Sequence, residues 1–192
     1  GKKWILKKIN NADVDFFKTN FFLDDITAKL LSIRKISRSN VETYLEPTIK
    51  SIIPNPFILK DMEKAIKRTI EFIKKKEFIG IFGDYDVDGA TATAILSRYF
   101  TAIGLKCEIY IPDRRTEGYG PSKKGFEHFI KKKIKLIYTV DCGTLSFEPI
   151  DYAKKKNVDV IVLDHHQSEV DLPKAHSVIN PNRIDDESKL NY

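Results

Sequence analysis

Seven side chains that can bind metal ions or move protons gather in three short motifs of this chain. They are Asp84, Asp86, Asp88, Asp141, Asp164, His165 and His166. The first three alternate along the chain, and alternate residues of an extended segment point the same way. Carboxylates that converge repel one another, and a divalent cation removes that repulsion. Oxygen ligands joined by one or two imidazoles suit Mn²⁺, Mg²⁺ or Fe²⁺ better than a thiolate-rich zinc site does.

The elements that must position these side chains follow from residue 57 onwards. Short apolar runs predict buried strands over residues 78–82, 106–111, 136–140 and 158–163. Between them, helical patterns cover residues 61–74, 90–103, 122–132 and 146–156. Asp61 is expected to cap the first of these helices, and Gly104 closes the second. Regular alternation of strand and helix predicts an α/β fold, a parallel, doubly wound, Rossmann-like sheet of at least four strands with helices on both faces.

Each polar motif directly follows one predicted strand. Residues 83–89 follow the first strand, residues 113–115 the second, residues 141–143 the third and residues 164–166 the fourth. The carboxyl ends of parallel strands share one edge of an open sheet, where ligands bind. We therefore expect the motifs to meet at that edge. Gly89 lets the backbone enter the next helix closely, and the start of that helix favours a bound phosphate.

The first quarter of the chain has a different pattern. Residues 1–50 mix aromatic and charged side chains without strong periodicity, and we interpret them as an N-terminal extension and connector. A helix is expected around residues 24–36. The stretch Pro47 to Pro56 is typical of a connector because Pro54 and Pro56 break regular structure. Residues 51–192 then form the domain that carries the motifs.

Composition narrows the class of protein. The chain carries a net charge of +6, which fits a polyanionic partner. Three lysine runs sit at the ends of predicted helices, where they complement the helix dipole and keep the surface hydrated. The two cysteines form no CxxC pair, which favours a reducing, cytoplasmic setting. The sequence contains no apolar run of a length that predicts a membrane span.

Each motif also has a simpler interpretation. An acidic DxDxDG start resembles a calcium-binding EF-hand loop, but the twelfth position, which needs a bidentate Glu, is Ile95. Asp141 alone would be interpreted as a helix cap, and the neighbouring motifs favour a ligand instead. Cys142 is expected to pack in the core rather than act as a nucleophile. His128 and His176 have no comparable context and are expected to be structural.

Together the motifs resemble a known family. The segments that carry the resemblance are GDYDVDGATATA, TVDCG and LDHH, which are similar to the DHH phosphoesterase superfamily. Within it, the chain resembles the RecJ family of bacterial single-strand-specific exonucleases. Further similar segments are LEPTIKSIIPNPFILKDMEKA, DRRTEGYGPS and HSVINPN. The similarity extends from about residue 41 to residue 183, and the joint set of motifs is specific although each motif alone is weak.

The resemblance implies a 5′→3′ exonuclease that acts on single-stranded DNA in recombination and repair with Mn²⁺ or Mg²⁺. The metal ligands that it implies are Asp84, Asp86, Asp88, Asp141 and His165. His166 would lie beside the scissile phosphate, Asp164 would orient a histidine, and Asp141 would bridge two metals. The implied substrate contacts are Arg114, Arg115, Tyr119 and Ser122. Implied partners are single-stranded DNA and a single-strand-binding protein or helicase, and we expect a monomer.

Two rival functions remain open, and one departure from the family pattern bears on activity. Manganese pyrophosphatases and small-oligonucleotide phosphodiesterases share the DHH motif, but they carry a His where this chain has Phe82. A non-catalytic DHH-type scaffold would usually lose metal ligands that this chain retains. RecJ-like proteins continue with a Gly-rich segment, a further metal-binding Asp and a second, strand-clamping domain. We therefore expect an N-terminal fragment with one ligand missing and with weak or absent activity.

Overall fold

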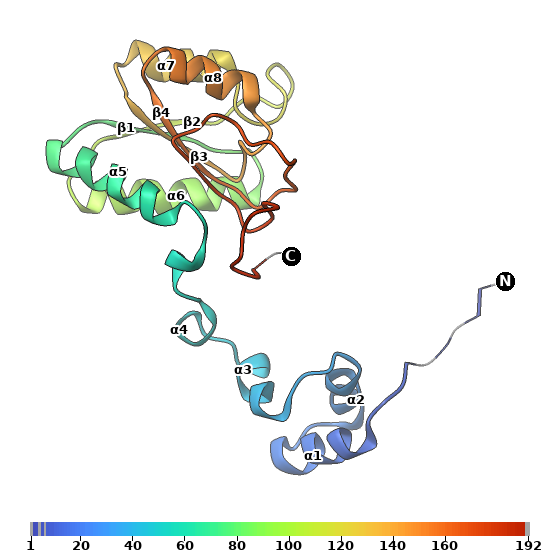
Figure 1. The fold of residues 1–192 in the computed structure, drawn as a ribbon. Helices are drawn as coiled ribbons and strands as arrows, with labels where there is room; N and C mark the ends of the chain where they lie inside the picture. Colours follow the sequence, from blue (N-terminus) through green and yellow to red (C-terminus); the bar gives the residue numbers. More distant parts are fainter. Residues whose placement is uncertain (1, 4, 6, 191–192) are drawn as a thin grey trace. The chain divides into compact units, whose positions relative to one another are not determined.

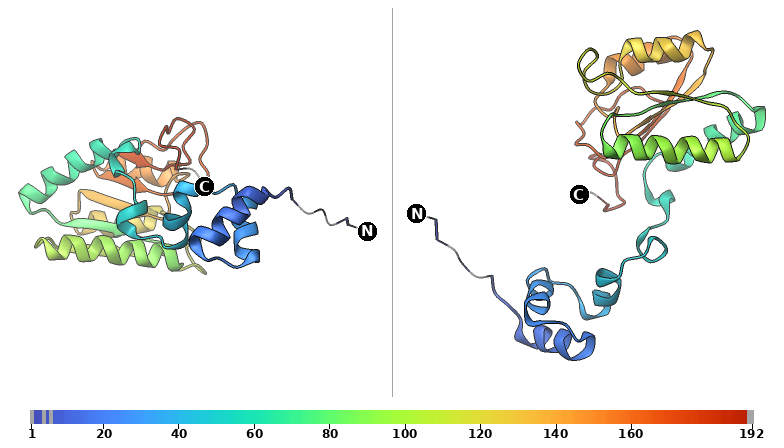
Figure 2. Two further views of the ribbon diagram at one scale, coloured as in Figure 1. Left: turned by 90° about the horizontal axis from the view of Figure 1, so that it is seen from below. Right: turned by 180° about the vertical axis from the view of Figure 1, so that it is seen from behind.

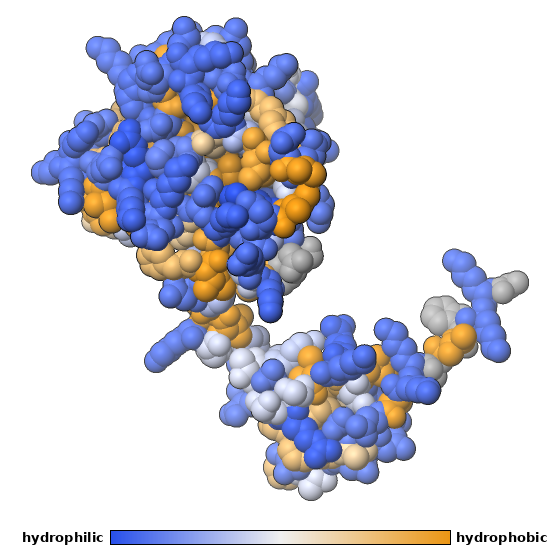
Figure 3. All heavy atoms as spheres, viewed as in Figure 1, coloured by the Kyte–Doolittle hydropathy of each residue, from blue (hydrophilic) through white to orange (hydrophobic). Residues whose placement is uncertain are grey.

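The computed structural model describes residues 2–3, 5 and 7–190. The chain divides after Pro54 into two compact units, an N-terminal unit and a sheet unit that begins at Asn55 (Figures 1 and 2). Within the described residues, no helix combines the length and the apolar character needed to cross a membrane. Hydrophilic side chains cover most of the visible face of the sheet unit (Figure 3).

The N-terminal unit is helical and has its own small core. Its helices are α1 (Asn11–Phe21), α2 (Asp25–Ile33), η1 (Arg38–Asn40), α3 (Val41–Leu45) and α4 (Ile49–Ile52). Side chains of Asn10 and Asp24 accept main-chain N–H bonds at the starts of α1 and α2, which satisfies donors that a helix leaves unpaired. The buried core consists of Val14, Phe17, Ala28, Leu31 and Val41. The predicted helix over residues 24–36 is present as the shorter α2, and α1 was not predicted.

The sheet unit is built on five parallel strands. They are β1 (Ile79–Phe82), β2 (Cys107–Tyr110), β3 (Leu136–Val140), β4 (Asp159–Leu163) and β5 (Ser177–Ile179). Their order across the sheet is β2-β1-β3-β4-β5, and every neighbouring pair is parallel. The predicted parallel, doubly wound fold is therefore confirmed, with one strand, β5, that the sequence pattern did not predict.

Helices cover both faces of this sheet (Figure 1). The sheet unit contains η2 (Pro56–Ile58), α5 (Met62–Lys75), α6 (Val87–Ala102), α7 (Lys123–Lys131) and α8 (Phe147–Lys155). Side chains alternate between the faces of a strand, so Ile79 and Ile81 join one core with Phe100 of α6. Phe82 faces the opposite core and packs with Phe126 of α7. Two apolar layers thus hold the sheet between two pairs of helices.

Two local predictions need correction. Helix α6 begins at Val87, three residues before the predicted start at residue 90, because the Asp86 side chain caps it. Asp61 does not cap α5, since it has a left-handed backbone with φ of 64° and makes no side-chain capping bond. Its carboxylate instead accepts hydrogen bonds from Val178 N at 3.1 Å and Arg183 Nη1 at 3.0 Å. A tertiary contact has replaced the local one.

Candidate metal centre

The candidate site lies where the order of strands changes direction. From β1 the chain crosses to β2 on one side, whereas β3 and then β4 lie on the other side. The connections after β1 and β3 therefore run in opposite directions across the sheet, and open α/β sheets bind ligands at such a switch point. The first loop carries the acidic segment 83–89, and the second begins at Asp141. The fold thus brings two motifs together that are far apart in the sequence.

The acidic loop is held tightly against the start of α6. Asp84 is buried, with 1% of its surface exposed, whereas Asp86 and Asp88 are exposed. The Asp86 carboxylate accepts the Gly89 N–H at 2.9 Å. A Cβ added at Gly89 would lie 2.6 Å from the Cβ of Asp84, closer than real atoms approach. Glycine at this position therefore allows the helix to start directly behind the Asp84 carboxylate.

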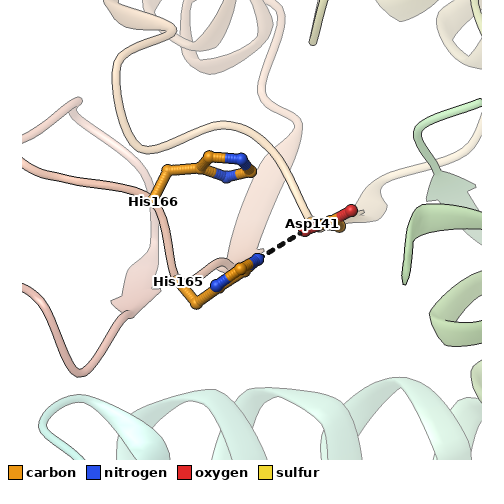
Figure 4. Close-up of side chains that lie close together, drawn as sticks. All are labelled: Asp141, His165 and His166. Atoms are coloured by element: carbon orange, nitrogen blue, oxygen red, sulfur yellow. Dashed lines mark hydrogen bonds and ion pairs between the residues drawn. The ribbon is translucent and has the colours of Figure 1, made fainter. Parts of the chain in front are cut away.

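Asp141 and the histidines complete the arrangement from the neighbouring loops. Asp141 follows β3 with a left-handed backbone, φ of 60°, and its N–H donates to Leu163 O at 2.8 Å. His165 and His166 follow β4. His165 Nε2 lies 3.0 Å from Asp141 Oδ1, and Figure 4 shows the His165 ring directed at that carboxylate. Both imidazoles are substantially exposed, with 57% and 45% of their side-chain surfaces accessible.

Two groups of side chains have the geometry to hold a metal ion. One consists of Asp84, Asp86 and Asp141, and the other of Asp141, His165 and His166. In each group, one ligand atom from every residue lies within 4.8 Å of the others. Asp141 belongs to both groups. Among the described residues, buried oxygens Asp84 Oδ1 and Asp141 Oδ2 have no hydrogen-bond partner. Unpartnered buried carboxylate oxygens are costly, so this set fits a hard divalent cation.

Two of the three carboxyl groups, Asp84 and Asp141, have a pKa above that of an ordinary aspartate. Burial, opposed in part by the Tyr85 N–H, raises the pKa of Asp84. Burial, followed by the neighbouring Asp86 carboxyl, raises the pKa of Asp141 to about 6. The pKa of Asp86 is lowered, chiefly by the Gly89 N–H that it accepts. The raised values indicate that the fold alone does not compensate the negative charge at this edge.

Asp164 fixes the orientation of His166 through a hydrogen bond. It is buried, and its Oδ2 accepts the Thr144 N–H at 3.0 Å while its Oδ1 lies 2.7 Å from His166 Nδ1. Burial opposes ionisation of Asp164, but hydrogen bonds from Thr144 and His166 outweigh it, and the pKa is lowered. Burial likewise opposes the charged form of His166, and the Asp164 carboxylate outweighs it and raises the pKa. Asp164 therefore orients His166 and favours its protonated form.

The remaining predicted residues are distributed around the centre. Tyr119 Oη donates to Asp141 O at 3.0 Å and lies 3.2 Å from His166 Nδ1. The Arg114 guanidinium lies over the Tyr85 ring, 5.4 Å from its centroid. Arg115 is exposed in the same loop.

Asp88 and Ser122 are arranged differently from the other predicted site residues. Asp88 belongs to neither metal-binding group, although it lines a hollow together with Asp141 and His165. The Ser122 hydroxyl accepts the Gly125 N–H at 3.1 Å and caps α7. Their roles as ligand and substrate contact stay predictions.

Three polar residues around the histidines were not predicted from the sequence. Thr144 and Asn180 are buried, and Asn182 is half-buried. The two asparagines lie in HSVINPN, a segment noted for its resemblance alone. An Asn after a buried strand is commonly a turn residue, so its type carried no distinctive signal.

The fold and this constellation define a metal-binding α/β domain, and comparison with known proteins places it. Residues 78–191 match the family described as DHH family, N-terminal domain. That match covers more than half of the chain, which therefore belongs to the DHH family, as the resemblance predicted.

Similar proteins include exonucleases named RecJ. The single-stranded-DNA-specific exonuclease RecJ of Bacillus subtilis is 30% identical over 179 residues, which cover 93% of this chain and 23% of that protein. RecJ of Haemophilus influenzae is 37% identical over 139 residues, which cover 72% of this chain and 24% of that protein. The chain thus spans about a quarter of the length of these relatives.

Solved structures agree with this placement. The crystal structure of exonuclease RecJ bound to manganese is 31% identical, with a TM-score of 0.63, and the match covers 70% of this chain and 34% of that one. RecJ of Thermus thermophilus in complex with Mn²⁺ has a TM-score of 0.73 at 24% identity, over 95% of this chain and 25% of that one. The second comparison shows that the fold is shared along nearly the whole chain.

Proposed function

We propose that this chain is the metal-binding part of a phosphodiester hydrolase, a 5′→3′ exonuclease that acts on single-stranded DNA in recombination and repair. One observation carries the proposal. The Asp84, Asp86 and Asp141 carboxylates converge with His165 and His166 at the carboxyl edge of a parallel sheet, and two buried oxygens of this set lack partners within the described residues. The RecJ relatives, one of which was crystallised with manganese, support the choice of substrate and of Mn²⁺ or Mg²⁺.

The donor set suggests which residues hold the ions. Asp84, Asp86 and Asp141 would hold one divalent ion, and Asp141 would be shared with a second ion held with His165. Bound divalent ions supply a water of lowered pKa and neutralise charge on the phosphoryl group. Asp88, at the first turn of α6, remains a further candidate ligand.

The chain's own residues would then position and protonate the substrate. His166, which Asp164 holds at 2.7 Å, presents a donor to a phosphate oxygen beside the centre. The raised pKa of His166 keeps this donor charged over a wider pH range. Tyr119, bonded to Asp141 O, limits the orientations of the His166 ring. Arg114 and Arg115 in the same loop supply positive charge for the DNA backbone.

The domain assignment follows from the same proposal. Residues 51–192 would contribute the catalytic carboxylates and histidines, and residues 1–50 would form an extension that precedes them. Single-stranded DNA is the proposed partner, and a single-strand-binding protein or a helicase would deliver it. A small-oligonucleotide or pyrophosphate hydrolase of the same family is the second candidate, but Phe82 occupies the position where those groups carry a His.

Calorimetric titration with Mn²⁺ tests the centre directly. We expect saturable binding to the wild-type chain and loss of binding in Asp141→Ala. Asp151→Ala, which removes a half-buried acid on α8 paired with Lys155, is the matched control and should bind as the wild type does. Equal binding in the wild type and Asp141→Ala would remove Asp141 from the site.

Substrate class is tested by supplying single-stranded DNA, a dinucleotide and pyrophosphate in the presence of Mn²⁺. We expect the chain to bind single-stranded DNA more tightly than the dinucleotide or pyrophosphate. Tighter binding of pyrophosphate or of the dinucleotide would contradict the exonuclease assignment while leaving the metal centre intact.

A further inference from the structure

The main chain of the two site histidines is held by side chains from another strand end. Asn180 and Asn182 follow β5, the strand paired with β4. Asn180 Nδ2 donates to His166 O at 2.9 Å, and Asn182 Nδ2 donates to His165 O. Both peptide carbonyls of the histidine pair are therefore fixed by amide groups, one from each asparagine.

Asn180 uses both N–H groups and the carbonyl oxygen of its side-chain amide. Its side chain is buried, with none of its surface exposed. Nδ2 donates a second hydrogen bond to Thr144 Oγ1 at 2.8 Å, and Oδ1 accepts the Asn182 N–H at 2.8 Å. Two donors and one acceptor are in use, which only a carboxamide of this length provides. A carboxylate of the same shape has no donor for either contact.

The contact with Thr144 links a third strand end to the pair. Thr144 follows β3, and its N–H donates to Asp164 Oδ2 at 3.0 Å. Asp164 in turn holds His166 through Nδ1. Asn180 thus joins the loops after β3, β4 and β5, and every bond in this bridge leads to His165, His166 or the carboxylate that orients them.

The asparagine segment is itself anchored to the body of the sheet unit. Arg183 is buried, and it donates to Val178 O and to Asp61 Oδ2, the latter at 3.0 Å. Arg183 Nε and Nη2 also donate to the Asp185 carboxylate at 2.9 and 3.0 Å. The chain on either side of Asn180 and Asn182 is therefore fixed to β5 and to the start of α5.

We propose that Asn180 is a positioning residue that, with Asn182, fixes the backbone of His165 and His166 in the orientation that metal binding needs. The inference rests on the proposed function, since it assigns a role toward the same centre. Asn180 touches neither a substrate nor an ion in this role. It restricts the histidine backbone before the metal arrives, so that the imidazoles need no reordering on binding.

The expected size of the effect follows from the behaviour of outer-shell partners of metal sites, whose loss typically costs about 10–100-fold in metal affinity. Asn180→Asp removes both donors at nearly constant volume and should weaken Mn²⁺ binding by that factor. Asn182→Ala removes only the bond to His165 O and should cost less, about threefold to tenfold. Ser177→Ala is the matched control, because Ser177 is buried in β5 and its hydroxyl has no hydrogen-bond partner among the described residues.

The experiment titrates Mn²⁺ calorimetrically into the wild-type chain and the three variants, after circular dichroism has established that each is folded. The inference expects the order wild type and Ser177→Ala, then Asn182→Ala, then Asn180→Asp. If Asn180→Asp does not fold, Asn182→Ala against Ser177→Ala decides the question.

Two outcomes overturn the inference, and they are distinguishable. A merely structural role would lower the melting temperature of the asparagine variants but leave the Mn²⁺ affinity of the folded protein unchanged, and the metal centre would stand without this bridge. Absence of Mn²⁺ binding to the wild type would instead remove the proposed function, and the inference with it.

Discussion

Two clusters of charge in the sheet unit have opposite designs. The acidic cluster, Asp84, Asp86 and Asp141, lies at the carboxyl edge of the sheet and contains like charges. The arginine cluster joins Arg183 to Asp61 and Asp185 near the start of α5, and its charges are opposite and hydrogen-bonded. In the acidic cluster, buried oxygens of Asp84 and Asp141 lack partners among the described residues. The arginine cluster is complete within the chain, whereas the acidic cluster needs a ligand from outside.

The pKa values of the two clusters express this difference. Hydrogen bonds from Arg183 and Lys60 lower the pKa of Asp185 to about 2. Burial and the neighbouring Asp86 raise the pKa of Asp141 to about 6. A lowered carboxyl pKa means that ionisation stabilises the fold, and a raised one means that ionisation destabilises it. The arginine cluster therefore stabilises the fold near neutral pH, whereas ionisation of the acidic cluster destabilises the metal-free fold.

The largest expected effect comes from a substitution in the acidic cluster. Asp141→Asn should weaken Mn²⁺ binding by about 100-fold or more, which corresponds to roughly 2.7 kcal/mol. The metal-free protein should be at least as stable as the wild type, because a destabilising charge is removed and Asn tolerates the left-handed backbone. Calorimetry and urea denaturation measure the two quantities. Asp185→Asn is the control in the other cluster, and unchanged Mn²⁺ affinity in Asp141→Asn would contradict the comparison.

The next largest effect is expected from a substitution in the arginine cluster. Arg183→Met keeps the apolar stem but removes the partner of Asp61 and Asp185. Both acids are partly exposed and can be hydrated after the change, so we expect a loss of about 2 kcal/mol in the free energy of unfolding, below the value for a fully buried pair. Urea denaturation measures this loss. A variant as stable as the wild type would show that the cluster is not a source of stability.

The pH dependence should have opposite signs in the two clusters. From the ordinary Asp pKa of about 3.9 up to the folded value of Asp141, the folded state binds the extra proton, so the contribution of Asp141 to stability falls as pH rises. The lowered pKa of Asp185 works the other way, and its contribution is lost as pH falls from about 4 toward its folded value.

The affinity for Mn²⁺ should depend on the ionisation of Asp141. Because Mn²⁺ must displace the proton on Asp141, its affinity should fall by up to about tenfold per pH unit below the folded pKa, or roughly 1.4 kcal/mol per unit. Calorimetric titrations at a series of pH values give the slope. An affinity that stays constant across this range would show that Asp141 is ionised before metal binds.

The smallest expected effect comes from Tyr119, which contacts the acidic cluster. Tyr119→Phe removes the hydroxyl that bonds to Asp141 O and contacts His166, which should cost about 1 kcal/mol of stability. Thermal unfolding monitored by circular dichroism measures it. Tyr44→Phe, in the N-terminal unit, serves as the control, and an equal loss in both variants would show that the Tyr119 contact has no special value.

Much of the fold was accessible from local sequence pattern. The four longer strands are short apolar runs between helical patterns, and the Asp86 and Ser122 side chains cap α6 and α7. Strand β5 was missed because Ser177–Ile179 is only three residues long and gains its stability by pairing with β4. Asp61 was misassigned because its partner, Arg183, lies 122 residues away in the sequence. Local rules cannot register such a contact.

The candidate site was likewise predictable only in part. The convergence of Asp84, Asp141 and His165 follows from the rule that parallel strands end at one edge. The bridge through Asn180 does not follow from it, because an amide that joins the His166 carbonyl to the Thr144 hydroxyl is visible only once β5 is placed. Carboxylates and histidines at strand ends can be recognised in the sequence, because these residue types are rare in a core. The role of a common polar residue such as Asn180 depends on its neighbours in the fold.

The left-handed backbone of Asp141 constrains how this site can change over evolutionary time. Glutamate offers the same carboxylate but is disfavoured at this φ, and glycine accepts the φ but offers no carboxylate. A saturation library at position 141 should therefore separate folding from metal binding, with asparagine and glycine enriched in a screen for soluble expression and aspartate alone enriched in a screen for bound manganese. We therefore expect no single substitution at this position to preserve both properties.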